Sequence, residues 1–425
     1  MTGRDMDDVT PDALDLSRYI REGDTVVWGQ ACAEPQTLTE RLMQQRADIG
    51  HFRCFLGIPA TDTVRPDHAD LVSFVSYIGS GGNRALHRAG RLDVLPAPYS
   101  SLPGLLGAGP LRADVVLVQL PPPDGDGRYS PGLADDYLGA ALRTARVVIA
   151  EVNDQVPYTY GPRTLGASDL DVVVRTSRPP AELRPGTPDS VTARVAARVA
   201  GLVDDGATLQ FGVGALPEAV LGLLTDRRDL GIHSGLINDA AMDLIEAGVV
   251  TGARKTLDRG EAVAGLLMGT RRLFRFAHRN PAIQLRDTGY THDPQTLAAQ
   301  HQLVAINSAI EVDLSGQVNS ELAGGRYIGA VGGAGDFLRG AARSPGGLPV
   351  VALPSTAGPA SRVVARLSGP VSTSRSDAGL FVTEYGVADL RGQPLRVRRE
   401  RMLAIAHPDH RAALEAALEE QGAPA

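Results

Sequence analysis

A glycine turn ahead of a predicted helix is the first stretch that could hold a reactive group. A short apolar run from Leu209 leads into Gly212, Val213 and Gly214, and a helix is predicted from Pro217. The start of a helix presents backbone N–H groups without intrahelical acceptors, together with the positive end of the helix dipole. Such a turn can bind a phosphate, a carboxylate or a developing oxyanion. Because strand, glycine turn and helix also form a common structural unit, the residues alone leave both interpretations open.

Two further glycine-rich stretches could serve a site. The turn at 231–235 reads GIHSG and could present a catalytic side chain, and the loop at 329–342 reads GAVGGAGDFLRGAA. Closely spaced glycines let the backbone approach a ligand and expose several N–H groups, although a plain flexible connection has the same composition. The chain has neither a Walker lysine motif nor a spaced GxGxxG, so nucleoside-triphosphatase and standard dinucleotide sites are not supported.

Polar residues in strand and turn positions supply candidate acids and bases. Glu384 directly follows an apolar run, and the carboxyl edge of a parallel sheet is where α/β proteins usually bind ligands. A surface salt bridge is the structural alternative. His292 lies in a turn, where its pKa near neutrality suits proton transfer. His407 and His410 lie close together in AIAHPDHR, where exposed or capping histidines are the more common finding.

Composition excludes several classes of protein. The chain has 425 residues, 43% of them apolar, and a formal net charge of −7, which argues against a general nucleic-acid or anionic-membrane binder. Lys255 is its single lysine, and Cys32 and Cys54 are its only cysteines, which suggests neither a disulfide framework nor a metal site. No signal peptide is recognisable and no apolar run approaches the roughly 18 residues of a membrane span, so we expect a cytoplasmic protein.

Hydrophobic runs alternate with helical patterns in both halves. Buried strands are predicted at 25–28, 114–120, 146–152, 170–175, 208–211, 303–306 and 348–353. Helices are predicted at 11–22, 134–145, 191–203, 217–224 and 398–419, the last with a break at Pro408. A stretch rich in proline and polar residues at 176–190 is the best linker candidate. We therefore expect two α/β domains with largely parallel sheets, at 1–185 and 186–425.

Taken together, these stretches resemble the acetyl-CoA hydrolase/transferase family, close to the 4-hydroxybutyrate CoA-transferases. The resemblance spans nearly the whole chain in the expected order. In the first half it rests on VLVQLPPPDGDGRYSPG (116–132) and VIAEVNDQVPYTYG (148–161). In the second half it rests on GVGALPEAV (212–220), DLGIHS (229–234), AINSAIEVDLSGQV (305–318), GGAGDFLRGA (332–341), VTEYGVADLRG (382–392) and IAHPDHR (405–411).

The resemblance implies two similar CoA-transferase-type α/β domains, an active site at their junction and often a homodimer. It also implies a CoA thioester as substrate, a small-molecule acceptor, no metal, and a ping-pong reaction in which a glutamate attacks an acyl-CoA. The glycine loops would contact CoA and the oxyanion through two sets of residues. These are Gly212, Val213, Gly214 and Ala215, and Gly332, Gly333, Ala334, Gly335 and Asp336.

Two positions depart from the family pattern. The family's glutamate follows the HS of the GIHS turn, and here that position is Gly235, which has no carboxylate for a covalent thioester. His292 stands where members usually carry an asparagine, whereas Glu384 is retained. Nearby acids, Asp239 and Glu246, do not occupy the missing position.

These departures predict direct acyl transfer from an acyl-CoA to an amine, an alcohol or water. His292 or Glu384 would act as the base, and N–H groups around Val213 and Gly333 would stabilise the oxyanion. Two alternatives stay open. One is a conventional CoA-transferase or hydrolase that uses a displaced carboxylate, Glu384 or Asp239. The other is a non-catalytic acyl-CoA binder.

Overall fold

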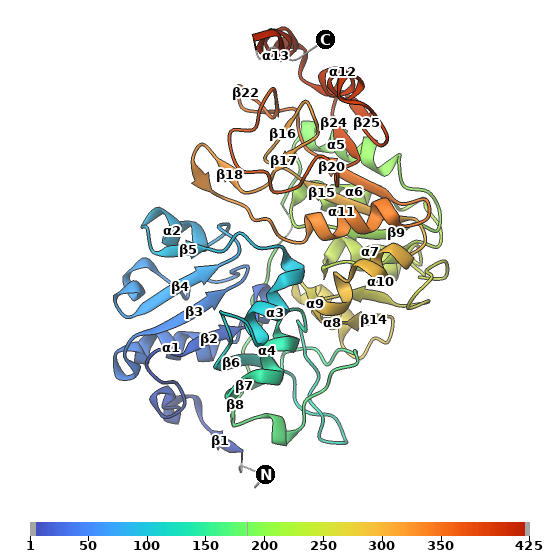
Figure 1. Cartoon of the computed structure of the whole chain (residues 1–425). Helices are drawn as coiled ribbons and strands as arrows, with labels where there is room; N and C mark the ends of the chain where they lie inside the picture. The colour runs from blue at the N-terminus through green and yellow to red at the C-terminus, as the bar shows by residue number, and fades with distance from the viewer. Residues whose placement is uncertain (1–5, 185, 421–425) are drawn as a thin grey trace. The chain divides into compact units, whose positions relative to one another are not determined.

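The chain folds into two compact units (Figure 1). The computed structural model describes residues 6–184 and 186–420. Within them, unit 1 contains 6–184, 235–239 and 263–291, and unit 2 contains the remaining described residues. The boundary predicted between the two domains, at residue 185, falls on a residue outside the described ones, so it stays a prediction. Two segments from the second half of the sequence, 235–239 and 263–291, pack with unit 1.

Unit 1 is built on an eight-stranded sheet in the order β1-β8-β7-β6-β2-β3-β4-β5, with every neighbouring pair parallel. β6 and β7 are buried at every residue, as expected for central strands covered on both faces. The strands predicted in the first half are confirmed. The sheet consists of β1 (Asp7–Val9), β2 (Thr25–Trp28), β3 (Phe52–Leu56), β4 (Val72–Ser76), β5 (Leu92–Val94), β6 (Val115–Leu120), β7 (Val147–Asn153) and β8 (Val172–Thr176).

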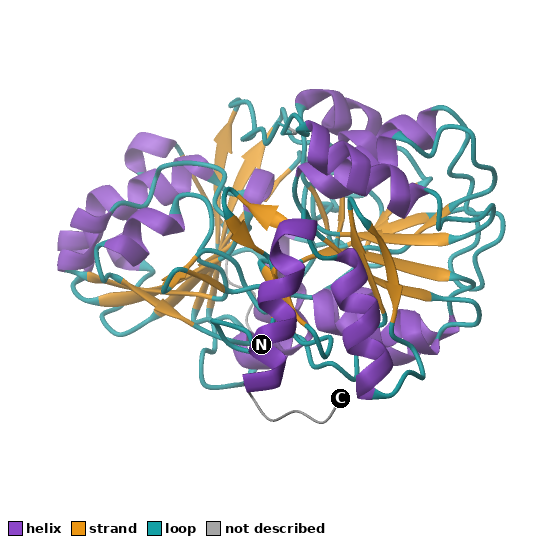
Figure 2. Cartoon of the chain, turned by 90° about the horizontal axis from the view of Figure 1, so that it is seen from above, coloured by secondary structure: helices purple, strands orange, loops and turns teal. Residues whose placement is uncertain are grey.

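Alternate residues of these strands form one face of the core of unit 1. Val26 and Trp28 of β2 belong to the same core cluster as Leu38 and Leu42, together with residues of six other strands of the sheet. Both leucines belong to the long helix α1. Figure 2 distinguishes the helices, in purple, from the strands, in orange. The helices of unit 1 are α1 (Gln36–Ile49), α2 (Asn83–Arg88), α3 (Leu102–Gly107), α4 (Leu138–Thr144), α8 (Arg271–Ala277) and α9 (Thr288–Thr291). Short strand pairs add β11 (Leu236–Ile237) with β13 (Leu266–Leu267), and β12 (Ala262–Ala264) with β14 (Ile283–Leu285).

The helix predicted at 11–22 is wrong. Two short 3₁₀ turns, Pro11–Ala13 and Leu16–Arg18, occupy this stretch instead. The Asp15 carboxylate accepts hydrogen bonds from the N–H of Ser17 at 3.1 Å and from its hydroxyl at 2.6 Å. Such local side-chain bonds compete with helix formation, which explains the interruption.

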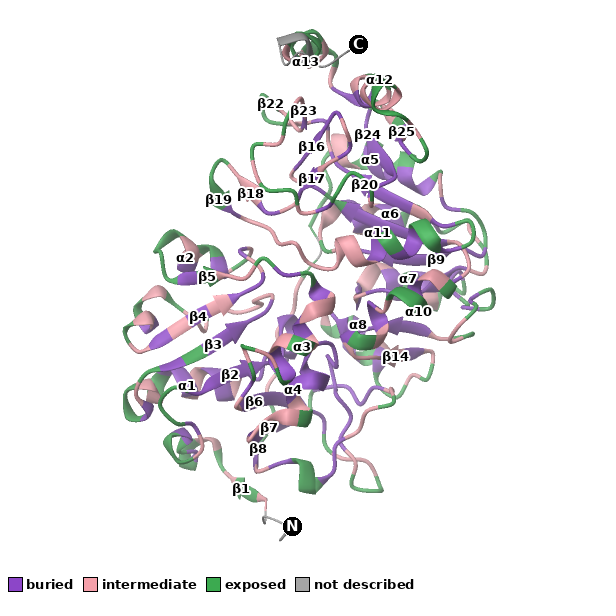
Figure 3. Ribbon diagram, in the orientation of Figure 1, coloured by how far each residue is buried: buried purple, intermediate pink, exposed green. Residues whose placement is uncertain are grey.

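Unit 2 contains a six-stranded sheet in the order β10-β9-β15-β20-β24-β25. Its first five strands are parallel and β25 is antiparallel to β24. Figure 3 shows the central strands as buried. The strands predicted in this half are confirmed. The sheet consists of β10 (Gly231–Ile232), β9 (Thr208–Phe211), β15 (Leu303–Ser308), β20 (Leu348–Ala352), β24 (Leu380–Thr383) and β25 (Gly386–Asp389).

Helices and short strands complete unit 2. The helix α11 packs its apolar face, Phe337, Leu338 and Ala341, into a core shared with β15, β20 and β24. The helices are α5 (Ser190–Ala200), α6 (Ala215–Gly222), α7 (Asp239–Glu246), α10 (Pro294–Ala299), α11 (Ala334–Arg343), α12 (Leu395–Ile405) and α13 (Pro408–Glu420). The short strands are β16 (Glu311–Asp313), β17 (Val318–Asn319), β18 (Leu322–Ala323), β19 (Arg326–Tyr327), β21 (Thr356–Ala357), β22 (Ala360–Ser361) and β23 (Val363–Val364).

Both units therefore combine helices with a largely parallel sheet, and the predicted α/β fold class is confirmed. The helical region predicted at 398–419 is divided into α12 and α13 at Pro408, as expected. Among the described residues, no helix combines the length and apolar character needed to span a membrane.

Candidate active site

The carboxyl ends of the parallel strands bring three predicted stretches of unit 2 to one sheet edge. Gly212 follows β9, His233 follows β10 and Glu384 follows β24. Neighbouring parallel strands end at the same edge, and open α/β sheets bind ligands outside that edge. These three stretches therefore lie along one edge of the same sheet, with the ends of β15 and β20 between Gly212 and Glu384.

The first glycine turn presents backbone donors at this edge. The N–H of Gly212 donates to the carbonyl of Ile306 at 3.1 Å, so that donor belongs to the sheet. Gly214 has φ +121° and caps α6, which begins at Ala215 rather than at the predicted Pro217. No described residue accepts a hydrogen bond from the N–H of Val213, whose side chain is 52% exposed. The turn thus keeps an N–H group available for a ligand.

The second glycine loop ends against His292. Gly332 has φ +58° and Gly333 caps α11, whose first turn contains Asp336. A Cβ atom at residue 333 would lie 2.6 Å from Nε2 of His292. The His292 ring also packs on Phe337, with ring centroids 4.5 Å apart. Glycine at position 333 therefore leaves the space that the imidazole occupies.

His292 is buried beside a second histidine. Burial, and to a lesser degree the charge of His233, lowers the pKa of His292 to about 3. The imidazole is therefore neutral near neutral pH and can donate one hydrogen bond and accept another. His233 is fully buried, and its Nδ1 lies 3.2 Å from Nε2 of Gln300. A base with so low a pKa binds a proton weakly, which favours a polarising role over proton abstraction.

Glu384 is held in a fixed orientation at the end of β24. One carboxylate oxygen accepts from the N–H of Ser355 at 2.9 Å and the other from the Ser355 hydroxyl at 2.7 Å. The backbone carbonyl of Glu384 accepts from Nε of Arg198 at 3.0 Å. Glu384 is only 7% exposed. Because Ser355 holds both carboxylate oxygens, the side chain is oriented before any ligand binds. Ser355 is a site residue that sequence reasoning missed, although it follows a predicted buried strand.

Comparison with known proteins supports an assignment to a family. Residues 11–179 match the acetyl-CoA hydrolase/transferase N-terminal domain, and residues 269–418 match the C-terminal domain of the same family. The chain is 41% identical over 342 residues to the 4-hydroxybutyrate coenzyme A transferase of Clostridium kluyveri, a match covering 80% of each chain. The chain belongs to the acetyl-CoA hydrolase/transferase family. It is accordingly an enzyme of acyl-CoA-dependent transfer or hydrolysis.

Solved structures support the same family fold. RipA from Yersinia pestis is 34% identical with a TM-score of 0.91, and the match covers 98% of this chain and 97% of that one. The 4-hydroxybutyrate CoA-transferase of Porphyromonas gingivalis is 33% identical with a TM-score of 0.82, covering 98% of both chains. The resemblance predicted from the sequence motifs is therefore confirmed.

Gly235, which the motif comparison places at the family's glutamate, belongs to unit 1. Its carbonyl accepts from the N–H groups of Gly265 at 3.0 Å and Leu266 at 3.2 Å, and β11 follows directly. The two nearby acids do not fill the position. Asp239 accepts from the N–H and hydroxyl of Thr270 at 2.9 and 2.6 Å, and Glu246 is exposed at the end of α7.

A buried polar cluster in unit 1 was also missed from the sequence. Nε2 of Gln30 donates to the Tyr99 hydroxyl at 2.6 Å and to Oδ2 of Asp136 at 2.8 Å. The hydroxyl of Tyr77 donates to Oε1 of Gln30 at 2.8 Å. Burial raises the pKa of Asp136 to about 6. Gln30 and Asp136 are 106 residues apart, so no local sequence signal could connect them.

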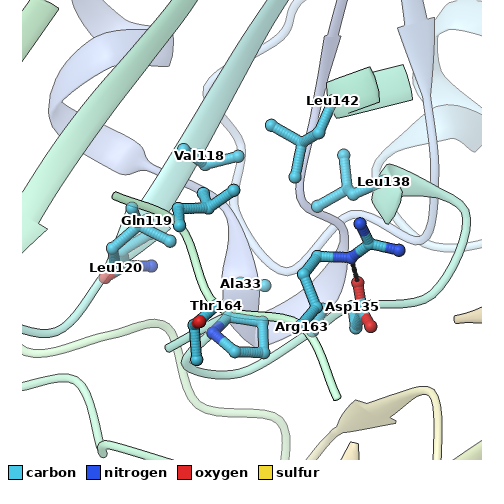
Figure 4. A pocket seen from close by; sticks show the side chains of 12 residues that line it. Ala33, Val118, Gln119, Leu120, Asp135, Leu138, Leu142, Arg163 and Thr164 are labelled. Atoms are coloured by element: carbon cyan, nitrogen blue, oxygen red, sulfur yellow. Dashed lines mark hydrogen bonds and ion pairs between the residues drawn. The ribbon is translucent and has the colours of Figure 1, made fainter. Parts of the chain in front are cut away.

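A small cavity in unit 1 lies beside the ion pair of Asp135 and Arg163 (Figure 4). Nε of Arg163 lies 2.5 Å from Oδ1 of Asp135, and most other lining side chains are apolar. Burial raises the pKa of Asp135 to about 6. The cavity volume is about 10 Å³, roughly the space of one water molecule, so it cannot hold an acyl group.

The described residues contain no cluster of three or more histidine, cysteine, aspartate or glutamate side chains suited to a metal ion. Cys32 and Cys54 are buried and form no disulfide. Burial raises the pKa of the Cys32 thiol to about 12 and that of Cys54 well above its usual value. Both side chains are therefore neutral thiols near neutral pH.

The contact between Gly333 and His292 gives a matched pair of glycine variants. We expect Gly333→Ala to lower the free energy of unfolding by about 1–3 kcal/mol, because the added methyl would displace the buried imidazole. Gly335→Ala, two residues along α11 and with no atom within 4 Å of the added Cβ, should be neutral or stabilising by about 0.5–1 kcal/mol. Urea denaturation measures both. Equal stability of the two variants would contradict the contact.

Proposed function

We propose that this enzyme transfers the acyl group of an acyl-CoA directly to an external amine, alcohol or water. The observation that carries the proposal is Gly235 at the position of the family's glutamate nucleophile. In the proposed reaction the external nucleophile attacks the thioester carbonyl carbon, and a tetrahedral oxyanion forms. The C–S bond then breaks, and the proton lost by the nucleophile passes through the base to the CoA thiolate.

The groups of unit 2 have distinct roles in this proposal. Glu384 acts as the base, because its carboxylate is oriented by Ser355. His292, with its lowered pKa, acts as a neutral hydrogen-bond donor to the substrate. The N–H groups of Val213 and Gly333 stabilise the oxyanion. The other residues of the two glycine loops contact CoA, as the family resemblance implies. A cytoplasmic homodimer is part of the same proposal.

A trapping experiment tests the absence of a covalent intermediate. The wild-type enzyme is incubated with acetyl-CoA, treated with borohydride, and digested for mass spectrometry. Borohydride reduces an enzyme-bound glutamyl or aspartyl thioester to the alcohol, so a modified peptide reports the intermediate. We expect no modified acidic residue in the wild-type protein. Modification of Glu384 or Asp239 would instead establish a displaced carboxylate nucleophile and overturn direct transfer.

Restoring the carboxylate should restore the covalent route. We expect Gly235→Glu to exchange CoA between acetyl-CoA and labelled acetate and to yield a borohydride-reduced residue at position 235, because glutamate is the family's nucleophile. The wild-type protein and Gly235→Gln should show only background exchange. Glutamine has nearly the same size as glutamate but no nucleophilic carboxylate, so it controls for the added bulk. Equal exchange by the glutamine and glutamate variants would contradict this prediction.

A further inference from the structure

A second cavity in unit 1 opens at the carboxyl ends of β2 and β3. Its lining includes Gln30 and Glu34 after β2, Gly57 after β3, and Thr61. The cavity volume is about 20 Å³, enough for a group of one or two heavy atoms by the size of a water site. It lies at the sheet edge where α/β proteins bind ligands, and the small volume limits its occupant to the end of a larger ligand.

Glu34 gives this cavity a buried acidic wall. The residue is 4% exposed, and its carboxylate accepts from the hydroxyls of Thr39 at 2.9 Å and Thr61 at 2.7 Å. Burial raises the pKa of this carboxyl group. No described Lys, Arg or His lies within ion-pair distance of it. Arg178, whose charge does reach Glu34, is already paired through both terminal nitrogens with Glu40 at 2.7 Å.

Glu34 differs from Asp135, another buried carboxylate of unit 1, in having no cationic partner. Asp135 in the neighbouring cavity has its own cation, Arg163. Glu34 has only neutral hydroxyl donors, and a buried carboxylate without a cation is costly to ionise. A ligand that supplies a positive charge inside the cavity would remove part of that penalty. A neutral ligand of the same size would not.

Contacts within unit 1 connect the cavity to Gly235. The 3₁₀ turn Ala31–Ala33, between Gln30 and Glu34 in the sequence, packs against β13. β13 pairs with β11, which begins directly after Gly235. Gly265 lies just before β13. A Cβ atom built on it would have the carbonyl oxygen of Gly235 and Cβ of Asp136 within 4 Å. Asp136 in turn accepts from Gln30 of the cavity wall.

We propose that this cavity binds an ammonium group at the end of a short acyl chain, with Glu34 as its counter-ion. The inference rests on the proposed function, because it assumes an acyl-CoA whose thioester lies near Gly235. It adds the chemical class of the acyl group. The enzyme selects an acyl-CoA whose chain ends in a cation over an acyl-CoA of equal length that ends in a methyl or hydroxyl group.

Three thioesters of equal size test the proposal by calorimetric titration. The probes are β-alanyl-CoA, 3-hydroxypropionyl-CoA and butyryl-CoA, which differ only in an ammonium, hydroxyl or methyl end. We expect the wild-type protein to bind β-alanyl-CoA about 10- to 100-fold more tightly than butyryl-CoA, the usual range for a hydrogen bond to a charged group. Glu34→Gln should bring this ratio to about one while the butyryl-CoA affinity stays the same.

Two control variants separate charge from packing. Thr61→Val removes one of the hydroxyls that donate to the Glu34 carboxylate but leaves the charge of Glu34, so the preference for β-alanyl-CoA should persist. Glu22→Gln changes an exposed glutamate of the same unit and should leave all three affinities unchanged.

Each other outcome has a definite meaning. Equal affinity for all three thioesters, or a preference that survives Glu34→Gln, would overturn the cation site while leaving the proposed acyl-CoA chemistry in place. Tight binding of 3-hydroxypropionyl-CoA, equal to that of β-alanyl-CoA, would show that a neutral donor suffices and would also overturn it. Binding of none of the three would refute the proposed function together with this inference.

Discussion

Replacing Glu384 by glutamine is expected to lower kcat/KM for acyl transfer by about 10²- to 10⁴-fold, the usual contribution of a positioned general base. Glutamine is close in size to glutamate, and its amide oxygen can still accept one of the two hydrogen bonds from Ser355. It cannot take a proton from the attacking nucleophile. The loss should therefore fall on the chemical step, with the affinity for the acyl-CoA little changed.

The pH dependence of the rate tests whether His292 is the base. Because the pKa of His292 is lowered to about 3, its protonation does not change across the neutral range. His292→Asn should therefore leave the shape of the pH–rate profile unchanged across the neutral range. Loss of a limb of the wild-type profile in this variant would instead assign the base to His292.

Two further variants complete this comparison. Ser355→Ala keeps the carboxylate but removes one of its donors, so its effect should be smaller than that of Glu384→Gln. Glu400→Gln changes an exposed glutamate whose partner is Arg396 on the same helix, and it should leave the rate unchanged. A comparable loss in Glu400→Gln would point to a general effect of charge rather than to the site.

The predictable part of this fold is the part set by local hydrophobic pattern. The run DVVLVQL is apolar at nearly every residue, which is typical of a central parallel strand, and β6 has all its residues buried. The apolar run before Glu384 likewise predicts a strand that ends there, and Glu384 directly follows β24. The prediction of a helix at 11–22 is wrong because the hydrophobic pattern does not reveal the local hydrogen bonds between Asp15 and Ser17.

The remainder depends on contacts between distant segments. Gly235 packs in unit 1 because β11 pairs with β13, some thirty residues along the chain, and this pairing has no local signature. Ser355 is oriented towards Glu384 only through the parallel packing of β20 and β24. The assignment of Gly235 to the position of the family's glutamate rests on the order of the motifs, because hydrophobic periodicity carries no information about it.

Replacing Asp136 by alanine is expected to lower the free energy of unfolding by about 3–5 kcal/mol near pH 4.5, the usual loss when a buried polar network loses one member. The Asp136 side chain is buried and accepts from three donors, the N–H of Leu138, the amide of Gln30 and the hydroxyl of Tyr99. Alanine would leave these donors without their acceptor inside the core. Asp93→Ala, at an exposed position of β5, should change stability by less than about 0.5 kcal/mol.

This loss should become smaller as the pH rises. Burial raises the pKa of Asp136 from 3.8 to about 6, so the folded wild-type protein holds its proton more tightly than the unfolded chain. Stability from this group is fully present below the unfolded pKa and declines as the pH rises through the folded pKa, by about 3 kcal/mol in total. About 2 kcal/mol of that decline lies between about pH 4.5 and 7.5, and the alanine variant does not undergo it.

The difference in unfolding free energy between wild type and Asp136→Ala should therefore shrink by about 2 kcal/mol over this range. Urea denaturation at the two pH values measures that difference directly. Because Asp135 is present in both proteins, its own titration largely cancels. A difference that stays constant with pH would show that Asp136 is ionised in both the folded and the unfolded states. A difference that grows with pH would mean that its hydrogen bonds stabilise the carboxylate more than burial disfavours it.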